Sequence, residues 1–289
     1  MILLQFIING ITIGGGYALI GIGLTMIFGI MNVVNFAHGE MYMLGAFFLY
    51  SLIALFGVNF YLSFILAVGL VMIVAFLFEK GVLKGIRNRP IDIVMLAMIG
   101  FSMLLQNLAM LIWSPVPVSI PSPFQEKAII VGGIYLLPSR ITVIVVALIL
   151  VIATHLLLKK TRMGKAMRAT FMDQEAASLM GISSNKVFAF TFTIGAGLAA
   201  AAGALLGPIF TVHPYIGNLA NLKAFAIVII GGLGSFVGAV VAGFMLGIFE
   251  SLGAVYVSSG YQDAVSFLML IIILIIKPTG LFGKMGQAR

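Results

Sequence analysis

The chain contains no cysteine and very little charge. Without cysteine it can form neither disulfides nor thiolate metal sites. Charged residues make up only 8% of its 289 residues, against about 25% in soluble domains. Hydrophobic residues make up 62%, and the mean hydropathy is +1.22. These values exclude an ordinary soluble domain and predict an all-α integral membrane protein that crosses the bilayer several times.

Motifs for nucleotide binding and hydrolysis are also missing. The chain has no G-x-x-x-x-G-K-[ST] loop to hold ATP phosphates, and no H-E-x-x-H or G-x-S-x-G motif. Its three histidines, His38, His155 and His213, are scattered along the chain, so a metal site is not expected. Glu250 and Asp263 fall at the ends of apolar runs, which gives no indication of a proton relay. We therefore predict that the chain is not an enzyme and holds no cofactor of its own.

The net charge of +8 comes from basic residues in the loops, which argues against nucleic-acid binding. Cytoplasmic loops of membrane proteins carry an excess of Lys and Arg. We therefore expect the segment 159–187 and the C-terminus to be cytoplasmic, and the N-terminus and the loop 113–140 to be external. No basic residue precedes the first apolar run, so this run is expected to be retained and not cleaved as a signal peptide. Of the 16 Lys and Arg residues, the three placed outside by this assignment are Lys127, Arg140 and Lys223.

About eight apolar runs approach the length needed to cross a bilayer: 3–30, 36–57, 60–78, 92–112, 141–158, 188–212, 223–249 and 263–276. Eight simple crossings would leave both termini on one side, so one run is expected to differ. The run 223–249 contains Gly231, Gly232 and Gly234 near its middle, where the backbone can turn. We predict a broken or re-entrant segment there that faces the substrate path, with a continuous glycine-packed helix as the alternative.

Small residues recur within the first and sixth runs, at Gly14–Gly16 and from Gly195 to Gly207. Helices in lipid associate where small residues let their backbones approach closely. These residues therefore predict tight contacts between helices, either within the chain or with a second subunit.

Polar residues at membrane depth are costly and are candidates for the substrate path or its gate. A cluster follows the first run, near the expected cytoplasmic face. Asn35 is expected to cap the next helix, with His38 at its third position. Capping and interfacial packing are the alternative to a gate or a contact with a driving partner. The candidates are Asn32, Asn35, His38 and Glu40 in this cluster, and Gln106 and Asn107 within the run 92–112.

The residues His213, Pro214 and Tyr215 lie in an expected external loop. Two roles remain open for them, as a contact for an external binding protein or as a turn.

The segment Arg162–Lys186 is charged and is flanked on both sides by apolar runs. Within it, apolar residues recur at helical spacing and predict one helix of about 16 residues that ends at Gly181. Its short apolar face would lie on the membrane surface or insert into a groove on a soluble partner. The residues of this face are Ala169, Met172, Ala176, Leu179 and Met180.

Within this segment, Glu175-Ala176-Ala177-Ser178-Leu179-Met180-Gly181 resembles the E-A-A-x-x-x-G core through which ABC importer permeases contact their ATPases. Four further stretches are similar to the LivH-type permease family of branched-chain amino acid importers: MNVVNFAHGEMYMLG at 31–45, HPYIGNLANLKAF at 213–225, GGLGSFVGAVVAGFMLGIFE at 231–250 and KPTGLFG at 277–283. The resemblance extends over nearly the whole chain and is weakest at 113–138. Permeases for urea, short amides and other amino acids share much of the NFAHGE pattern.

The resemblance implies one permease domain over 1–289, with an ABC importer permease fold, in the bacterial inner membrane. It implies inward transport of leucine, isoleucine and valine by alternating access; a permease for urea or short amides, or a self-sufficient channel for small neutral solutes, is the alternative. The implied partners are a LivM-like permease, two cytoplasmic ATPases (LivG- and LivF-like) that use ATP-Mg, and a periplasmic binding protein. The implied ATPase-coupling residues are Gly164, Arg168, Met172, Asp173, Glu175, Ala176, Ala177, Leu179 and Gly181.

Overall fold

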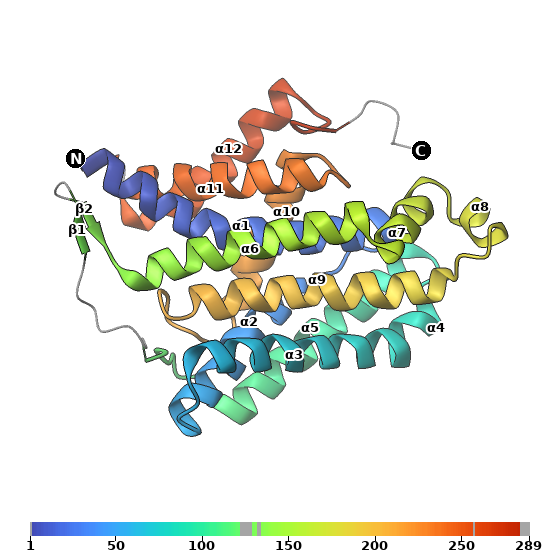
Figure 1. Ribbon diagram of the computed structural model, residues 1–289, viewed down its shortest axis with the longest axis horizontal. Helices are drawn as coiled ribbons and strands as arrows, with labels where there is room; N and C mark the ends of the chain where they lie inside the picture. Colours follow the sequence, from blue (N-terminus) through green and yellow to red (C-terminus); the bar gives the residue numbers. More distant parts are fainter. Residues whose placement is uncertain (1, 122–128, 132–133, 257, 284–289) are drawn as a thin grey trace.

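The computed structural model describes residues 2–121, 129–131, 134–256 and 258–283, in which long helices form a bundle and run roughly along one common direction (Figure 1). The longer helices are α1 (Ile2–Met31), α2 (His38–Tyr50), α3 (Phe60–Phe78), α5 (Ile91–Trp113), α6 (Pro138–Lys160), α9 (Ser184–Leu206), α10 (Ile216–Gly231), α11 (Phe236–Tyr256) and α12 (Gln262–Ile276). The shorter ones are α4 (Lys84–Ile86), α7 (Arg162–Met172), α8 (Gln174–Leu179), the π-helical turns Ser51–Leu55 and Glu79–Leu83, and the 3-10 turn Ser259–Tyr261.

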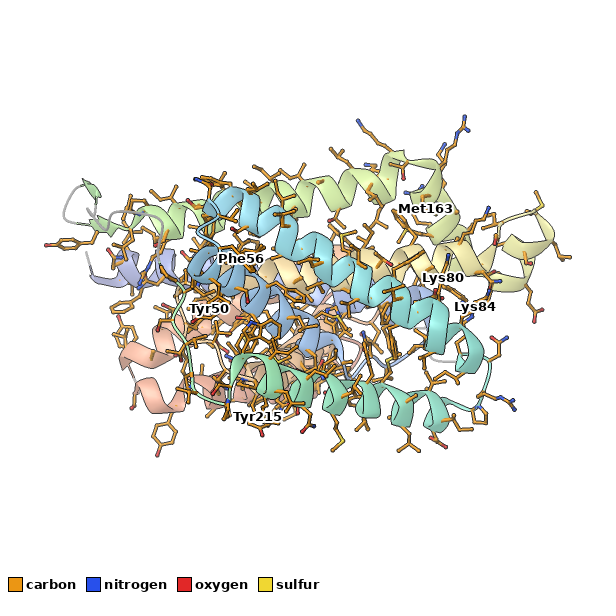
Figure 2. The ribbon with its side chains drawn as sticks, turned by 90° about the horizontal axis from the view of Figure 1, so that it is seen from below. Tyr50, Phe56, Lys80, Lys84, Met163 and Tyr215 are labelled. Atoms are coloured by element: carbon orange, nitrogen blue, oxygen red, sulfur yellow. The ribbon has the colours of Figure 1, made fainter. Side chains whose placement is uncertain are left out.

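The two ends of the bundle carry different structures. At one end, called the hairpin end, β1 (Ile129–Val131) pairs antiparallel with β2 (Ile134–Leu136), and the Gln5 side chain makes two 2.9 Å hydrogen bonds to the Tyr135 backbone. The opposite end, called the α8 end, carries α4, α7 and α8 (Figure 1). Figure 2 shows Lys80 and Lys84 toward the α8 end and Tyr50, Phe56 and Tyr215 toward the hairpin end. The labelled lysines and the labelled aromatic residues therefore lie toward opposite ends of the bundle.

The prediction of an all-α membrane protein is confirmed. Within the described ranges, seven helices are long and apolar enough to cross a membrane, and α10 and α12 are shorter apolar helices. The run predicted at 60–78 coincides with α3. The run predicted at 188–212 extends too far, because α9 ends at Leu206 and the backbone turns where the N–H groups of Ile209 and Phe210 bond to the Leu206 carbonyl.

Helices α1 and α9 form the centre of the bundle. In the apolar windows of these helices 72% and 83% of residues are buried, compared with 22–28% for α3, α5 and α6. The three outer helices therefore present most of their apolar side chains to the surroundings, as expected for faces that meet lipid or another subunit.

Small residues make the contacts between the central helices. A Cβ placed on Gly45 of α2 would lie 2.2 Å from the Ala200 carbonyl oxygen of α9. A Cβ on Gly14 of α1 would lie 2.8 Å from the Phe244 Cα of α11. The prediction of tight helix–helix contacts at small residues is therefore confirmed within the chain.

The predicted break in the run 223–249 is confirmed, because α10 and α11 are separate helices joined at residues 232–235. Gly232 and Gly234 have φ angles of +95° and +77°, which favour glycine. The turn does not lie at mid-depth, however, as a re-entrant half-helix would require. It lies beside Gly29 near the α8 end, because α10 begins upstream at Ile216 and the glycines terminate it.

The segment 277–283 folds back onto the end of α10. The Leu281 N–H donates to the Ile230 carbonyl (2.7 Å), and the Phe282 N–H donates to the Gly231 carbonyl (3.1 Å). These bonds satisfy carbonyl groups that a helix end leaves without intrahelical partners. Lys127, which was assigned to the outside, lies outside the described residues, as do Lys284 and Arg289 of the C-terminus that was assigned to the cytoplasm.

Candidate substrate path and coupling segment

The charged segment after α6 forms two helices, so the prediction of one continuous helix is wrong. Asp173 separates α7 from α8 with an extended backbone (φ −160°), and its carboxylate accepts the Ala176 N–H at 2.9 Å. Aspartate favours such a cap because its short side chain bonds the neighbouring backbone in competition with a helix. Gly181 follows the end of α8 with φ +83°, as expected for a glycine just past a helix end.

Three large apolar side chains of this segment project away from the bundle. Met172, Leu179 and Met180 are 85%, 89% and 83% exposed. Glu175 and Ala176 are exposed as well, whereas Ala177 is buried against the protein. A cluster of exposed large apolar side chains at the end of a helix bundle is typical of an interaction surface.

Helix α7 is attached to the end of α6. A Cβ on Gly164 would lie 2.1 Å from the Leu157 carbonyl oxygen, so only glycine fits there without displacement. The Thr161 hydroxyl accepts the Gly164 N–H (2.9 Å), and the Arg168 guanidinium donates to the Leu158 carbonyl (2.8 Å). Gly164 and Arg168, predicted as coupling residues, thus hold α7 against α6.

Phe171 at the end of α7 connects the coupling segment with the glycine turn. Cβ atoms placed on Gly29 and Gly234 would lie 3.3 and 3.0 Å from its ring. This contact borders a cavity of about 410 Å³ between α1, α6, α7 and α11, with Met26, Leu158 and Phe236 also in its wall. Gly231 and Gly238 pack together beside it, where a Cβ on Gly231 would lie 2.5 Å from the Gly238 carbonyl carbon.

Glu40 is the centre of a buried polar cluster that joins α2, α5 and α10. Its Oε1 accepts hydrogen bonds from the Ser102 hydroxyl (3.0 Å) and the Gln106 amide (2.7 Å). The Gln106 amide is also 2.7 Å from Asn218 Oδ1 on α10. Asn107 does not join this cluster, because its amide donates to the Met103 carbonyl of its own helix.

The cluster around His38 lies deeper than predicted. His38 is fully buried, and its Nε2 is 3.0 Å from the Ile20 carbonyl in the middle of α1. Asn35 is not the residue that precedes α2; its Oδ1 accepts the Ala37 N–H (3.0 Å), and His38 is the first helical residue and not the third. This local Asx-type bond stabilises the turn at 35–37, and α2 begins after it, inside the bundle.

The remaining candidates in connecting segments have roles in chain geometry. Asn32 is exposed and ends α1 with φ +51°, a conformation that asparagine tolerates. The carbonyl of His213 accepts the Ile216 N–H (3.0 Å), so that His213, Pro214 and Tyr215 form the turn before α10. Their role in docking a binding protein stays a prediction.

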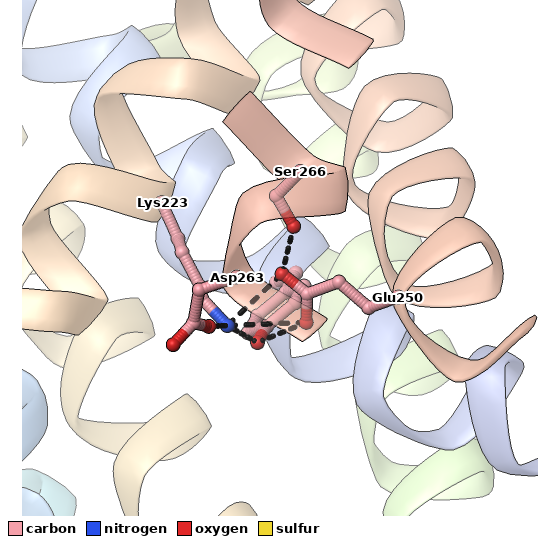
Figure 3. Close-up of polar contacts among 5 residues, drawn as sticks. Lys223, Glu250, Asp263 and Ser266 are labelled. Atoms are coloured by element: carbon pink, nitrogen blue, oxygen red, sulfur yellow. Dashed lines mark hydrogen bonds and ion pairs between the residues drawn. The ribbon is translucent and has the colours of Figure 1, made fainter. Parts of the chain in front are cut away.

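A buried charge cluster was missed by the sequence reasoning (Figure 3). The Lys223 Nζ lies 2.9 Å from Glu250 Oε1, 2.8 Å from Asp263 Oδ1 and 2.6 Å from the Tyr17 hydroxyl. Glu250 also accepts hydrogen bonds from Tyr17 (2.8 Å) and Ser266. The external position predicted for Lys223 is wrong, because α10 begins seven residues before it. A lone lysine within an apolar helix was the available signal.

A second ion pair lies at the α8 end. The Arg87 guanidinium is 3.2 Å from Glu79 Oε1, bonds to Asn185 and lies 4.7 Å from the centre of the Phe188 ring. Burial lowers the pKa of Arg87 from its ordinary value and the Glu79 carboxylate opposes this shift. The pair connects the end of α3 with the start of α9. Among the described residues, no group of three or more His, Asp and Glu could hold a metal ion.

Comparisons with known proteins agree with this architecture. Residues 6–274 match the family model of the branched-chain amino acid transport system permease component. The chain is 38% identical to the high-affinity branched-chain amino acid transport permease LivH of Escherichia coli K12, over 97% of this chain and 96% of that protein. It is 36% identical to BraD of Pseudomonas aeruginosa, with the same coverage of both chains. No solved structure matches the chain.

Proposed function

Because the chain belongs to the family of branched-chain amino acid transport permease components, we propose that it is the transmembrane permease subunit of an ATP-binding-cassette importer for leucine, isoleucine and valine. The match to LivH over 97% of the chain is the observation that carries this proposal. The chain is a transport subunit and not an enzyme, and hydrolysis of ATP-Mg belongs to its partners. The whole chain, 1–289, acts as one permease domain in the bacterial inner membrane.

The α8 end faces the cytoplasm and the hairpin end faces outward in this proposal. Lys80 and Lys84 lie toward the α8 end (Figure 2), and Arg87 bonds to Asn185 at the start of α9 there. Helix α7, with Arg162, Lys165 and Arg168, lies at the same end (Figure 1). Their position supports this orientation, because basic residues near the ends of membrane helices are retained on the cytoplasmic side. The N-terminus is then external and the C-terminus cytoplasmic.

The permease works with four kinds of partner. A second, LivM-like permease packs against it in the membrane, two ATPases of the LivG and LivF type bind the cytoplasmic side, and a periplasmic binding protein delivers substrate near His213–Tyr215. The exposed side chains of Met172, Leu179 and Met180 support the ATPase contact, since such a surface gains free energy when a partner covers it.

Coupling between the ATPases and the path passes through Phe171. When the ATPases close, they displace α8 and α7, and the Phe171 ring presses on the backbone at Gly29 and Gly234. These two glycines belong to α1 and to the turn between α10 and α11, so a displacement of one ring changes how three membrane helices pack. The Glu40 cluster, which joins α2, α5 and α10, is the second candidate gate.

Substrate selection resides mainly in the binding protein. A path lined by apolar and small side chains discriminates one methylene by only about 1–3 kcal/mol. The permease then needs only to admit a small aliphatic zwitterion in one direction.

Reconstitution in proteoliposomes with the four partners tests the proposal. Uptake of labelled leucine, isoleucine and valine is expected to require both ATP and the binding protein, and labelled urea should not accumulate. An ATPase variant without its phosphate-binding lysine is the matched control and should abolish uptake. Solute flux through the chain alone, without ATP, would instead favour a channel, and accumulation of urea would favour the related permeases.

A further inference from the structure

A second cavity, of about 260 Å³, opens beside the buried charge cluster. It lies between α1, α2, α10, α12 and the segment 210–213. One part of its wall is apolar and the other is charged or polar. The apolar members include Ile20, Phe210, Ile216 and Leu219, and the polar ones include Thr211, His213, Lys223, Gln262 and Asp263.

The cluster beside this cavity has an excess of negative charge. Lys223 faces two carboxylates, those of Glu250 and Asp263. Glu250 is fully buried, and both of its oxygens receive donors, from Lys223, Tyr17 and Ser266. The protons of the Lys223 ammonium are used by Tyr17 and the two carboxylates, so this cation has none left for a second anion.

Asp263 carries the accessible carboxylate of this cluster. Its side chain is 49% exposed, whereas that of Glu250 is 0% exposed. Asp263 Oδ1 is paired with Lys223, and the carboxylate also forms part of the cavity wall. A carboxylate retains capacity for several hydrogen bonds when it has one partner. The cavity therefore presents an anionic group at one side and aliphatic or aromatic side chains at the other.

We propose that this cavity is a substrate subsite in which Asp263 binds the α-ammonium group of an aliphatic amino acid. The aliphatic side chain contacts Ile20, Phe210 and Leu219, and the α-carboxylate faces the polar groups of Thr211, His213 and Gln262. The inference rests on the proposed function, since it concerns the substrate of that transport. The volume is just below the usual range of ligand pockets, about 300–1,000 Å³, which suits one small amino acid.

The position of the cavity agrees with a site on a transport path. Tyr17 and Ile20 lie in the middle of α1, while Phe210 and His213 lie in the connection that leads to the start of α10. The cavity thus extends from that connection toward the middle of the bundle. Binding sites in transporters are commonly near the middle of the bilayer.

The absence of cysteine allows a direct test. Leu219, which is 40% exposed in the cavity wall, is replaced by cysteine in the complete complex, whose other subunits are made free of reactive cysteine. The rate of modification by a methanethiosulfonate reagent is measured with three probes. Leucine has both charged groups, isopentylamine has only the ammonium group, and 4-methylpentanoate has only the carboxylate. Phe56→Cys, 73% exposed at the same end of the bundle, is the control position.

Leucine and isopentylamine are expected to slow labelling at Leu219→Cys, and 4-methylpentanoate is not. Asp263→Asn should raise the leucine concentration needed for protection about tenfold or more, as for loss of a charged hydrogen bond. Asp263→Glu should restore much of the protection. Unchanged labelling at Phe56→Cys in each variant shows that the fold is kept.

Three results would overturn the subsite. They are equal protection by 4-methylpentanoate, protection that survives Asp263→Asn, and absence of protection by leucine in the Leu219→Cys complex that retains Asp263. Each would leave the importer function intact if the same complex takes up leucine with ATP. Failure of uptake in the parent complex would instead contradict the proposed function, so the two failures are distinguishable.

Discussion

The ring of Phe171 lies against Gly234, so closely that a Cβ on Gly234 would come within 3.0 Å of Phe171 Cζ. The two residues are far apart in the chain, one at the end of α7 and the other in the turn between α10 and α11. Their contact connects the exposed helices of the α8 end with a break in the membrane helices.

Replacement of Gly234 by alanine should strongly reduce ATP-driven leucine uptake while the complex still assembles. The residue has φ +77°, so alanine brings backbone strain of about 1–2 kcal/mol, and its methyl group displaces Phe171. Uptake and assembly are measured on the same preparations.

Gly57→Ala is the matched control for this prediction. Gly57 has φ +63° with no atom within 4 Å of an added Cβ. Alanine at this position therefore brings the same kind of backbone strain as at Gly234, but without contact to a neighbouring side chain. Phe171→Ala alone should also reduce uptake, and combining it with Gly234→Ala should cost little more than either change alone if both act through this contact. Equal losses in Gly57→Ala and Gly234→Ala would argue against a role for Phe171.

Introduction of a charge on the exposed face of α8 should uncouple the ATPases. Leu179→Asp places a carboxylate on a side chain that is 89% exposed, so the fold is retained and a partner groove would have to bury the charge. Substrate-stimulated ATPase activity is expected to fall to the unstimulated rate. Ser178→Asp, on the neighbouring exposed position, should have a smaller effect. Normal stimulation in Leu179→Asp would remove α8 from the ATPase contact.

The hydrogen bond by which Asp173 caps α8 is expected to support ATPase coupling, because it stabilises α8. Asp173→Ala removes the acceptor for the Ala176 N–H and is expected to destabilise α8 by about 1 kcal/mol. Asp173→Asn keeps a capping oxygen and should retain stimulation close to the parent. The ATP cost per leucine transported, measured for both variants, distinguishes them. If alanine and asparagine behave alike, the cap has no role in coupling.

Loss of Arg87 should destabilise the α8 end. Arg87→Met leaves Glu79, whose side chain is 1% exposed, without its ion-pair partner, and the expected loss is about 3 kcal/mol. This loss of stability is measured as a lower midpoint temperature in thermal unfolding of the purified permease in detergent. The double variant Glu79→Gln, Arg87→Met should regain most of the loss, because no buried charge remains. A single variant as stable as the parent would contradict this account.

The sequence predicted most of the membrane helices, because apolar length is a local property. The run 60–78 coincides with α3, and the glycines at 231–234 do mark a break. What the apolar pattern did not indicate was where α10 starts, since Ile216–Asn221 is only moderately apolar. The run was predicted to start at 223, whereas α10 starts at Ile216. Lys223 was therefore assigned to the external side, and the glycine turn was expected in the middle of the membrane segment.

The site residues were predictable to the extent that they act within one segment. The exposed stripe of Met172, Leu179 and Met180 follows from helical spacing, although the cap at Asp173 divides the helix. The partners of Lys223 were not predictable in this way. Glu250 and Asp263 are 27 and 40 positions away, and their approach depends on how α10, α11 and α12 pack.

The ion pairs of Lys223 anchor α10 near the middle of the helix. Lys223 pins the helix at its middle to α1, α11 and α12, while Gly231 at its end adjoins the turn that Phe171 touches. Gly231 is eight positions after Lys223, which corresponds to about 12 Å along the helix. If α10 tilts as a rigid body about this anchor, motion of Gly231 toward one side moves Ile216 and the cavity beside it toward the other. A displacement at one end of the bundle would then become an opposite displacement at the other end.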